Sequence, residues 1–313
     1  MTASLDIIIV NWNAGVQLCD CLQSINTVNR DGFELSRVVV VDNASRDWSA
    51  NGLEYRRLPL TIIRNKENRG FAPACNQGAK GSMADYLLFL NPDTRLFADS
   101  LCKPINFMEK PANEYIGICG VRMQEESGKM MTSCAHFPNL RLMFSEMTGL
   151  YRLSPKLFKR HFLAESECTQ SMEIDQVIGS FFLVRKSIFV ALHGFDERFF
   201  VYYEEVDFSL RAKQKGFTSY YLSEVSIFHR GGGITEQVKS IRLFYSLRSK
   251  VIYGFKNFPY LHAIALALLT FSIELMARVV RSAINLSFSQ FLETIGAYKR
   301  LVIYFIGRGF RWK

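Results

Sequence analysis

The chain has 313 residues, of which 49% are hydrophobic and 21% are charged, a composition typical of a globular protein and not of a disordered one. Seven cysteines are scattered without any CxxC pair, which indicates neither a zinc knuckle nor a disulfide framework and favours a reducing compartment. The formal net charge is +9, and residues 236–313 contain 12 Lys and Arg against three Glu, which accounts for the whole excess. The first 235 residues are therefore neutral overall, and we expect no nucleic-acid partner.

The N-terminal stretch MTASLDIIIVNWN has no basic segment followed by a long apolar run. Such a pattern would mark a signal peptide, so we expect a cytoplasmic protein.

The first half of the chain alternates short apolar runs with helical patterns. The strand-like runs are LDIIIVNWN, RVVVVDNAS, LTIIRN and DYLLFLNPD, and helical stretches such as VQLCDCLQSI lie between them. Strands that are apolar on both faces and separated by helices predict βαβ units, hence an α/β fold with a mostly parallel central sheet flanked by helices. Ligands of such sheets bind beyond the carboxyl ends of the strands.

Asn and Asp follow each of these four predicted strands. They are Asn11 and Asn13, Asp42 and Asn43, Asn65 and Asn68, and Asn91 and Asp93. One such ending is commonplace, because Asn and Asp cap helices and form turns. Four of them predict a shared polar ligand at one edge of the sheet.

No phosphate-binding loop of the GxGxxG or GxxxxGK[ST] type is present. The nearest stretch is NRGFAPACNQG, residues 68–78, in which Gly70 would allow close backbone approach ahead of a helix. A nucleotide held here would need a cation to meet its phosphate charge. Asp93, on the turn after LLFLN, is a candidate cation ligand, and a turn or capping role is the alternative.

Three carboxylates, Glu204, Glu205 and Asp207, lie within four residues of the stretch VYYEEVDFSLRAKQKG. Carboxylates this close repel one another, so they are either solvated, or they bind a cation or take part in proton transfer. The alternative is a solvated helix start, because acids stabilise the positive end of the helix dipole. Asp207 precedes Arg211 by four residues, and we expect that pair to be structural.

The C-terminal region is apolar as well as basic. Its run AIALALLTFSI, between His262 and Glu274, has 11 residues, fewer than the about 20 that a membrane-spanning helix needs. We therefore expect no span. A basic, aromatic and apolar segment suits the surface of an anionic bilayer, and core helices of a larger domain are the alternative.

Seven motifs follow one another along the chain: IIIVNWN, VVVVDNASRD, NRGFAPACNQG, LFLNPDT, IGSFFLVRKSIF, GFDERFFVYYEEVDFSLRAKQKG and FHRGGG. This set, in this order, resembles the inverting family 2 glycosyltransferases of the GT-A fold, and most of all their bacterial rhamnosyltransferase branch. The resemblance covers Asp6 to Gly233. It implies a GT-A (Rossmann-like) catalytic domain in residues 1–235, with a nucleotide-sugar-binding half (1–114) and an acceptor-binding half (115–235). Residues 236–313 would form a helical, membrane-associating region.

The resemblance also implies roles for single residues in binding the donor. Val10, Asn11 and Asn13 would line the pocket of the nucleobase and ribose, and Asp42 would hydrogen-bond the pyrimidine. Asn68, Gly70, Phe71 and Asn76 match the segment that closes over the nucleotide and sugar. Asp93 matches the last aspartate of the DxD motif, which binds Mg²⁺ or Mn²⁺ at the diphosphate. Asn91 stands at the first DxD position, which removes one charge and strengthens the case for His229 as a further ligand of the metal or diphosphate.

The acid cluster matches the element that carries the catalytic base in this family. Glu205 would be the base and Glu204 its support. Sugar transfer needs a hydroxyl deprotonated as it attacks the anomeric carbon and a cation for the departing diphosphate. With direct displacement one base suffices, whereas double displacement would need a nucleophilic carboxylate at the opposite face.

The resemblance implies transfer of L-rhamnose from dTDP-β-L-rhamnose to a lipid-linked saccharide in O-antigen-type polysaccharide synthesis, at the inner face of the plasma membrane. Another UDP- or dTDP-sugar is an alternative donor. A sugar nucleotidyltransferase would need a Gly- and Arg-rich N-terminal loop, which VNWNAGVQL does not supply. A catalytically silent carbohydrate-binding or scaffold protein remains an alternative that Asn91 alone supports, and a homo-oligomer is left open.

Overall fold

The computed structural model describes residues 2–53, 58–231 and 239–307. The chain forms two compact units, here called the sheet unit and the helical unit. The sheet unit contains Met1–Phe137, Phe162–Glu197 and Glu204–Ile234, and the helical unit contains Pro138–His161, Arg198–Tyr203 and Thr235–Lys313. The expected boundary between residues 235 and 236 lies outside the described residues. Two earlier segments, 138–161 and 198–203, pack with the C-terminal helices, whereas the sequence placed them in the catalytic domain.

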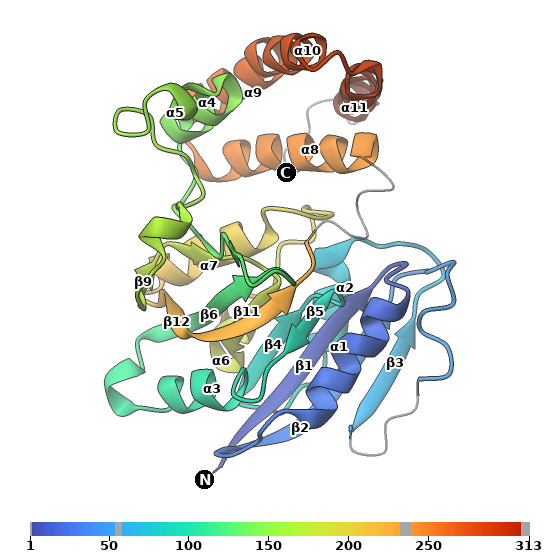
Figure 1. The fold of residues 1–313 in the computed structure, drawn as a ribbon, viewed down its shortest axis with the longest axis vertical. Coiled ribbons are helices and arrows are strands. Elements are labelled where there is room, and N and C mark those ends of the chain that lie inside the picture. The colour runs from blue at the N-terminus through green and yellow to red at the C-terminus, as the bar shows by residue number, and fades with distance from the viewer. Residues whose placement is uncertain (1, 54–57, 232–238, 308–313) are drawn as a thin grey trace. The chain divides into compact units, whose positions relative to one another are not determined.

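The sheet unit is built on one large sheet, whose strands run in the order β3-β2-β1-β4-β11-β6-β12-β5 (Figure 1). Its strands are β1 (Ala3–Asn11), β2 (Phe33–Asp42), β3 (Leu60–Arg64), β4 (Tyr86–Leu90), β5 (Thr94–Leu96), β6 (Ile116–Gln124), β11 (Phe181–Arg185) and β12 (Thr218–His229). The short strands β7 (Met130–Met131) and β9 (Met172–Ile174) pair with β6 and β12, and β8 (Cys134–Ala135) pairs separately with β10 (Gln176–Val177). The ladders joining β1, β2, β3 and β4 are parallel, as expected. In the second half, β11 runs antiparallel to both β4 and β6, and β12 is parallel to β6.

Helices cover both faces of this sheet, which explains why its strands are apolar on both sides. The helices of one face are α1 (Val16–Thr27) and α3 (Cys102–Met108), and those of the other are α2 (Phe71–Ala79), α6 (Lys186–Ala191) and α7 (Glu204–Gln214). Alternate residues of β1 serve the two cores: Ile7 and Ile9 pack with α1, and Ile8 packs with α2. Single-turn 3₁₀ helices lie at Pro111–Asn113 and Glu165–Glu167. The α/β architecture predicted from the sequence is thus confirmed.

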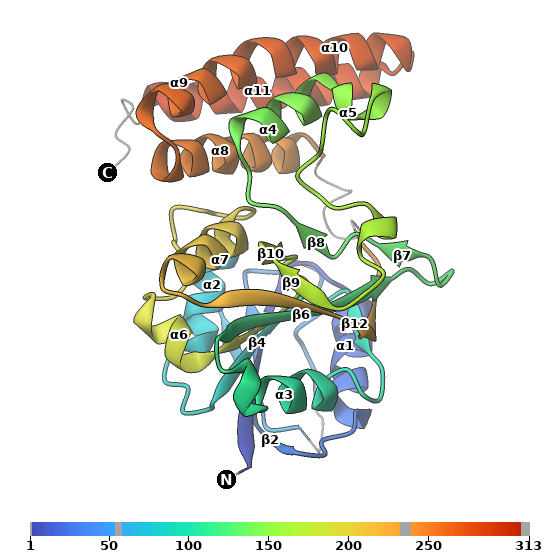
Figure 2. The same ribbon diagram turned by 90° about the vertical axis from the view of Figure 1, so that its left-hand side faces the viewer.

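The helical unit contains α4 (Leu140–Thr148), α5 (Leu150–Leu153), α8 (Lys239–Asn257), α9 (Tyr260–Leu269), a π-helical turn (Thr270–Glu274), α10 (Leu275–Ile284) and α11 (Phe288–Gly307). Its core is formed by Leu247 and Val251 of α8 with Tyr298, Leu301 and Phe305 of α11. In Figure 2, α9 and α10 run on as one long helix beside α11. A buried ion network lies within this unit, in which Glu274 pairs with Lys250 of α8 and with Arg278 at 2.9 Å.

The 11-residue apolar run is part of a longer helix than the run alone indicated. Among the described residues, Tyr260–Ile284 is long and apolar enough to cross a membrane by length and composition, with a mean hydropathy of 1.9. The helix continues through Glu274 into α10, and the buried Glu274 carboxylate is neutralised by Lys250 and Arg278. Only 22% of its most apolar window is buried within the protein.

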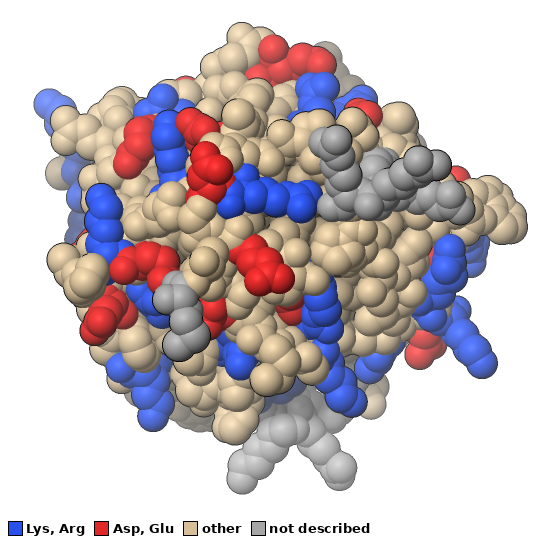
Figure 3. Space-filling view, turned by 90° about the horizontal axis from the view of Figure 1, so that it is seen from below, with Lys and Arg blue, Asp and Glu red and all other residues tan. Residues whose placement is uncertain are grey.

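On the face shown in Figure 3, Lys and Arg side chains are interspersed with Asp and Glu. A mixed surface of this kind creates no strong single-sign field.

Candidate active site

The strand ends that carry the candidate residues meet at one edge of the large sheet. Asn11 and Asp42 are paired in register at the carboxyl ends of β1 and β2. Because β11 is antiparallel to β4, its first residue, Phe181, pairs with Leu90 at the end of β4. His229, at the end of β12, pairs with Thr94. The expected convergence of polar side chains at the carboxyl edge is therefore what the topology produces.

Asn11 and Asp42 form the centre of a buried polar cluster. The Asn11 amide nitrogen donates to Asp42 Oδ1 at 3.0 Å, to Ser45 Oγ at 3.1 Å and to Ser49 Oγ at 2.8 Å. Asn11 is fully buried and Asp42 is 8% exposed. Asn11 Oδ1 has no hydrogen-bond partner among the described residues, and a buried acceptor without a donor is costly unless a ligand or water supplies one.

Val10 and Asn13, on either side of this cluster, have mainly structural surroundings. Val10 is buried in the core shared with α2. Asn13 has a φ of 54° and joins two loops: its backbone N–H donates to Ser45 Oγ at 2.9 Å and its Oδ1 accepts from the Arg46 N–H at 2.7 Å. These bonds fix the loop that follows β1 against the loop that follows β2.

Asn43, for which the sequence predicted no individual role, organises the turn before α2. Its amide nitrogen donates to Asn68 Oδ1 at 2.9 Å and to the Gly70 carbonyl at 3.0 Å. Asn68 Oδ1 also accepts from the Gly70 N–H at 2.9 Å. Gly70 has a φ of 96°, a region that side chains with a Cβ rarely adopt, and Phe71 begins the helix directly after it. Asn68 and Gly70 thus lie where the sequence predicted, on a turn at the edge of the sheet.

Asn76 has a different environment from the one that the resemblance implied. Its Oδ1 accepts from the Phe195 N–H and its Nδ2 donates to the Phe195 carbonyl, both at 2.9 Å. It also lines a hollow of about 910 Å³ beside α2 and α6, together with Lys80, Lys186 and His193. Because its amide is bound to backbone on both sides, this geometry favours a structural role for Asn76.

Asp93 and His229 approach each other across the turn after β4. Nε2 of His229 is 3.4 Å from Oδ1 of Asp93 and 3.3 Å from Oγ of Ser180. The Asn91 amide donates to the same Ser180 Oγ at 3.2 Å. Asp93 is 8% exposed, and Nδ1 of His229 is buried with no partner among the described residues.

These residues fit a divalent cation of the kind that the sequence predicted. A carboxylate and an imidazole nitrogen in contact are donors that bind Mn²⁺, and the carboxylate alone suits Mg²⁺. In the part of the chain that the structure describes, no group of three or more His, Cys, Asp and Glu side chains could hold a metal ion. Two protein ligands leave further positions of an ion for diphosphate oxygens and water, and Asn91 lies beside them as a neutral side chain bound to Ser180.

Glu204 and Glu205 begin helix α7 and lie in low-dielectric surroundings. Glu204 is 4% exposed, and Oε2 of each side chain is buried without a partner among the described residues. Burial raises the pKa of Glu204 well above its usual value, and the charge of Glu205 adds to the rise. Burial also raises the pKa of Glu205, but backbone N–H groups, including that of Gly179, donate to its carboxylate and oppose the rise. The pair is therefore not the solvated helix start that was the alternative.

The third acid, Asp207, has the structural role that its spacing predicted. Its Oδ2 accepts from Arg211 Nε at 2.8 Å, and the side chain is fully buried. Arg211 also donates to the carbonyls of Leu192 and Gly194, so the pair ties α7 to the preceding loop.

The dipeptide Gly179–Ser180 joins the acid pair to the candidate cation ligands. The Gly179 N–H donates a hydrogen bond to the Glu205 carboxylate. The Ser180 hydroxyl is hydrogen-bonded to His229 Nε2 and accepts from the Asn91 amide. The sequence displayed this dipeptide inside the motif IGSFFLVRKSIF, but only the antiparallel insertion of β11 beside β4 shows its role.

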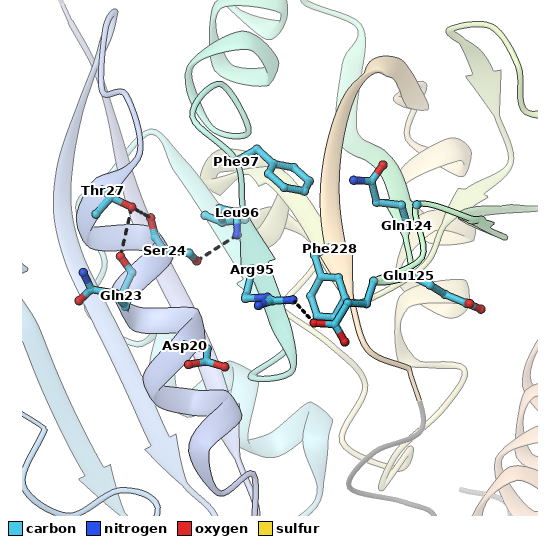
Figure 4. Close-up of a pocket in the computed structure, with 12 residues that line it drawn as sticks. Asp20, Gln23, Ser24, Thr27, Arg95, Leu96, Phe97, Gln124, Glu125 and Phe228 are labelled. Atoms are coloured by element: carbon cyan, nitrogen blue, oxygen red, sulfur yellow. Dashed lines mark hydrogen bonds and ion pairs between the residues drawn. The ribbon is translucent and has the colours of Figure 1, made fainter.

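A second hollow, of about 570 Å³, is lined by residues of α1, β5 and the end of β12, among them Ser24, Arg95 and Phe228 (Figure 4). Arg95 stacks on the Phe228 ring at 4.0 Å and pairs with Glu126 at 3.3 Å. Ser24 Oγ of α1 accepts from the Leu96 N–H at 3.0 Å. These contacts fix β5 and the end of β12, the two strands that position the candidate cation ligands.

A mostly parallel sheet with a candidate cation site and an acid pair at its carboxyl edge is an arrangement in which a ligand binds beyond the strand ends. The sequence profile described as "Glycosyl transferase family 2" matches residues 6–190, more than half of the chain. The chain belongs to this glycosyltransferase family.

Two similar proteins of known name are rhamnosyltransferases. The chain is 32% identical over 146 residues to "Rhamnosyltransferase WbbL" of Escherichia coli (strain K12), covering 46% of this chain and 52% of that protein. It thus spans about half the length of that relative. It is 24% identical over 244 residues to "N-acetylglucosaminyl-diphospho-decaprenol L-rhamnosyltransferase" of Mycobacterium tuberculosis (strain ATCC 25618 / H37Rv), covering 73% of this chain and 76% of the relative.

Solved structures show the same fold at low sequence identity. The mannosyltransferase PcManGT of Pyrobaculum calidifontis, in complex with GDP-Man and Mn²⁺, matches 95% of this chain and 86% of its own, with a TM-score of 0.56 and 17% identity. The S. aureus TarS 1-349 structure with UDP-GlcNAc matches 96% of this chain and 81% of its own, with a TM-score of 0.54 and 15% identity. The chain has the GT-A glycosyltransferase fold, as the sequence predicted.

Proposed function

We propose that this protein transfers a sugar from a nucleoside diphosphate donor to a hydroxyl group with inversion, and that Glu205 is the catalytic base. The observation that carries the proposal is the buried acid pair, joined through Gly179–Ser180 to Asp93 and His229. Inverting transfer needs one base on the acceptor side and charge neutralisation at the donor phosphates. The acid pair would supply the base, and Asp93 with His229 would hold the cation that neutralises the donor phosphates.

The two glutamates have different tasks in this mechanism. Two neighbouring buried carboxyl groups do not both ionise readily, so the pair tends to hold one proton. Glu204 keeps that proton, because burial and the charge of Glu205 both raise its pKa. Glu205 stays the ionised partner, because the Gly179 N–H and other backbone N–H groups donate to its carboxylate. It can then accept the proton of the attacking hydroxyl.

Asp93 and His229 would hold Mg²⁺ or Mn²⁺ at the donor diphosphate. When bound, the ion neutralises the charge that develops on the leaving diphosphate. The Mn²⁺ in the complex of the structurally similar PcManGT supports a divalent ion without deciding which one. Ser180 orients the imidazole through its hydroxyl, and Asn91 holds Ser180 in turn.

The proposed donor is dTDP-β-L-rhamnose. Asp42 and the unpartnered Oδ1 of Asn11 would face the donors and acceptors of a pyrimidine, with Val10 and Asn13 shaping the wall and Asn68, Gly70 and Phe71 closing over the ribose and sugar. Two curated relatives are named as rhamnosyltransferases, which supports the sugar. Another UDP- or dTDP-sugar is the alternative donor.

The proposed acceptor is a lipid-linked saccharide at the cytoplasmic face of the plasma membrane, in the synthesis of a cell-surface polysaccharide. The name of the mycobacterial relative specifies a diphospho-decaprenol-linked acceptor, which supports a lipid-linked one here. The enzyme would reach such an acceptor as a peripheral protein.

The helical unit offers a surface for that membrane. We define its apolar face by residues of α9, α10 and α11 whose side chains are 41–77% exposed: Leu261, Leu268, Met276, Val280, Ile284, Phe288, Leu292, Ile295, Val302, Ile303 and Ile306. An apolar patch on this scale marks an interaction surface. Arg281, Lys299 and Arg300 are exposed on the same helices and suit anionic lipid headgroups. The basic residues Arg308, Arg311 and Lys313 lie outside the described residues.

The helix Tyr260–Ile284 would lie in the plane of the membrane and not cross it. Its opposite side carries Thr270, Glu274 and Ser282, which are buried inside the helical unit. Glu274 is paired with Lys250 of α8, so a span would take both charges into hydrocarbon. An amphipathic helix with one buried polar side fits the interface.

A panel of nucleotide sugars tests the function directly. We expect the protein with Mg²⁺ or Mn²⁺ to release dTDP from dTDP-β-L-rhamnose faster than UDP or GDP from UDP- and GDP-sugars. If the protein turns over a UDP-sugar in preference, the proposed donor is wrong and the proposed reaction type stands. No donor turnover and no donor binding by calorimetry would support the carbohydrate-binding or scaffold alternative.

A further inference from the structure

The segment that leads into the acid pair is bound to helix α8. Arg198–Tyr203 belongs to the helical unit, and the next residues in the chain, Glu204 and Glu205, begin α7 of the sheet unit. The acid pair therefore follows directly in the chain on a segment that packs within the helical unit.

Contacts from one side of α8 hold almost every residue of this segment. Tyr245 stacks on Phe200 with a ring separation of 4.3 Å and an interplanar angle of 9°, and Tyr253 lies 5.3 Å from the Tyr203 ring. Ser249 Oγ, itself fully buried, donates to the Val201 carbonyl at 2.8 Å. Two cations add to these: Arg248 donates to the Arg198 carbonyl at 3.2 Å, and Lys256 lies 5.9 Å from the Phe199 ring.

The spacing of these α8 residues shows that they form one surface. Residues 245, 249, 253 and 256 recur every three or four positions, so they share one side of a helix. The segment Arg198–Tyr203 therefore packs along one side of α8 over several turns of the helix.

The backbone of this segment is strained where it reaches the acid pair. Tyr202 and Tyr203 have φ values of 68° and 72°, in the left-handed region that bulky residues rarely adopt. Such conformations persist only when surrounding contacts over-determine them, and they cluster at functional sites. The α8 contacts, with Tyr253 on Tyr203 and Ser249 on Val201, supply that constraint.

We propose that α8 is a positioning element for catalysis: Tyr245, Ser249 and Tyr253 hold Arg198–Tyr203 in its strained form and so fix Glu204 and Glu205 for proton abstraction. This inference rests on the proposed function, because it assigns the task to the same acid pair. It makes these three α8 side chains positioning residues that touch neither donor nor acceptor. A helical unit that would otherwise serve only for membrane attachment then contributes to the chemical step.

The test compares Tyr245→Ala with Tyr245→Phe in the full-length protein, assayed by dTDP release from dTDP-β-L-rhamnose. We expect Tyr245→Ala to lower kcat about 10- to 100-fold with donor KM nearly unchanged, since small misplacement of a reacting group has effects of that size. Tyr245→Phe keeps the stacked ring and should restore kcat. Phe271→Ala is the matched control, because it removes a ring of the same unit that packs on Tyr298 and Phe305 of α11.

Hydrogen–deuterium exchange supplies a readout that needs no ligand. Peptides covering residues 198–207 should exchange faster in Tyr245→Ala than in the parent, Tyr245→Phe or Phe271→Ala. If Tyr245→Ala does not fold, Ser249→Ala removes one hydroxyl and carries the same expectation. Unchanged exchange and unchanged kcat in a folded variant would overturn the proposal, and so would equal losses in Phe271→Ala. A parent that does not turn over this donor counts against the proposed function, while the exchange result still decides the role of α8.

Discussion

Nε2 of His229 lies 3.4 Å from Oδ1 of Asp93, although 136 positions separate the two residues in the chain. The antiparallel pairing of β12 with β5 brings them together, and Ser180, in the turn before β11, hydrogen-bonds the same imidazole nitrogen. A carboxylate and an imidazole in contact can share a cation, which makes metal dependence the first property to measure.

Removal of the cation should suppress turnover. We expect EDTA to abolish donor turnover and Mg²⁺ or Mn²⁺ to restore it. Asp93→Ala should weaken dTDP binding strongly when the ion is present and hardly at all in EDTA, as measured by isothermal titration calorimetry. His229→Ala should have a smaller effect in the same direction. Full activity in EDTA would mean that protein cations alone meet the phosphate charge.

Loss of the proposed base should affect the chemical step and leave donor binding intact. Glu205→Gln keeps the shape and removes the charge, so kcat should fall by about 10²- to 10⁴-fold with the donor Kd nearly unchanged. Glu205→Asp retains a carboxylate and should keep measurable activity. A Glu205→Gln protein that turns over like the parent would place the base elsewhere.

Glu204 should destabilise the folded protein as the pH rises. Its folded pKa is raised above the usual 4.5, so the native state holds the proton more tightly than the unfolded chain does. The stability this gives is present below pH 4.5 and is lost as the pH rises through the folded pKa. Glu204→Gln, which stays neutral, should therefore have a higher Tm than the parent at pH 8 and the same Tm near pH 4.

The control for that measurement is Glu114→Gln, which removes an exposed carboxylate from the same unit. It should leave the Tm difference between pH 4 and pH 8 as it is in the parent. If Glu204→Gln lowers the Tm at pH 8, the buried carboxylate has a stabilising partner and the assignment of the proton to Glu204 fails.

The buried ion network of the helical unit should matter for stability through its pairing. Lys250→Met leaves Glu274 buried with Arg278 as its remaining cation partner among the described residues, and breaking a buried pair in this way costs about 3–5 kcal/mol. The double variant Lys250→Met/Glu274→Met should recover most of that loss, because no uncompensated charge remains. Urea denaturation of the parent and both variants measures the effect. A double variant as unstable as the single one would show that Lys250 acts by packing.

Membrane association should depend on the apolar face. Val280→Lys places a charge at its centre on α10, where the parent side chain is 54% exposed, and should greatly reduce flotation with anionic liposomes. The control Val190→Lys changes a side chain that is 61% exposed on α6 of the sheet unit and should leave flotation unchanged. High salt should weaken the binding to anionic vesicles, since exposed charges are screened over about 8 Å at physiological ionic strength. Equal binding to neutral and anionic vesicles would show that electrostatic attraction does not contribute to membrane association.

Local patterns in the sequence already determined the elements and most of the candidate residues. The apolar runs that became β1, β2 and β4 are buried on both faces, so their composition alone identified them. Glu204 and Glu205 are adjacent in the chain, and a close pair of acids is visible without a structure. Asn11 and Asp42 end parallel neighbouring strands, and the rule that ligands bind at that edge brought them together.

The tertiary structure decided the features that depend on contacts between distant segments. Ser180 links Asn91 to His229 only because β11 inserts antiparallel beside β4. The Asn76 amide donates a hydrogen bond to the backbone carbonyl of Phe195, 119 residues away, so this amide has a structural role. Glu274 can be buried because Lys250, on another helix, neutralises its carboxylate. Periodicity and spacing report a residue's near neighbours in the chain, whereas pairing and burial of charge depend on partners that only the folded chain supplies.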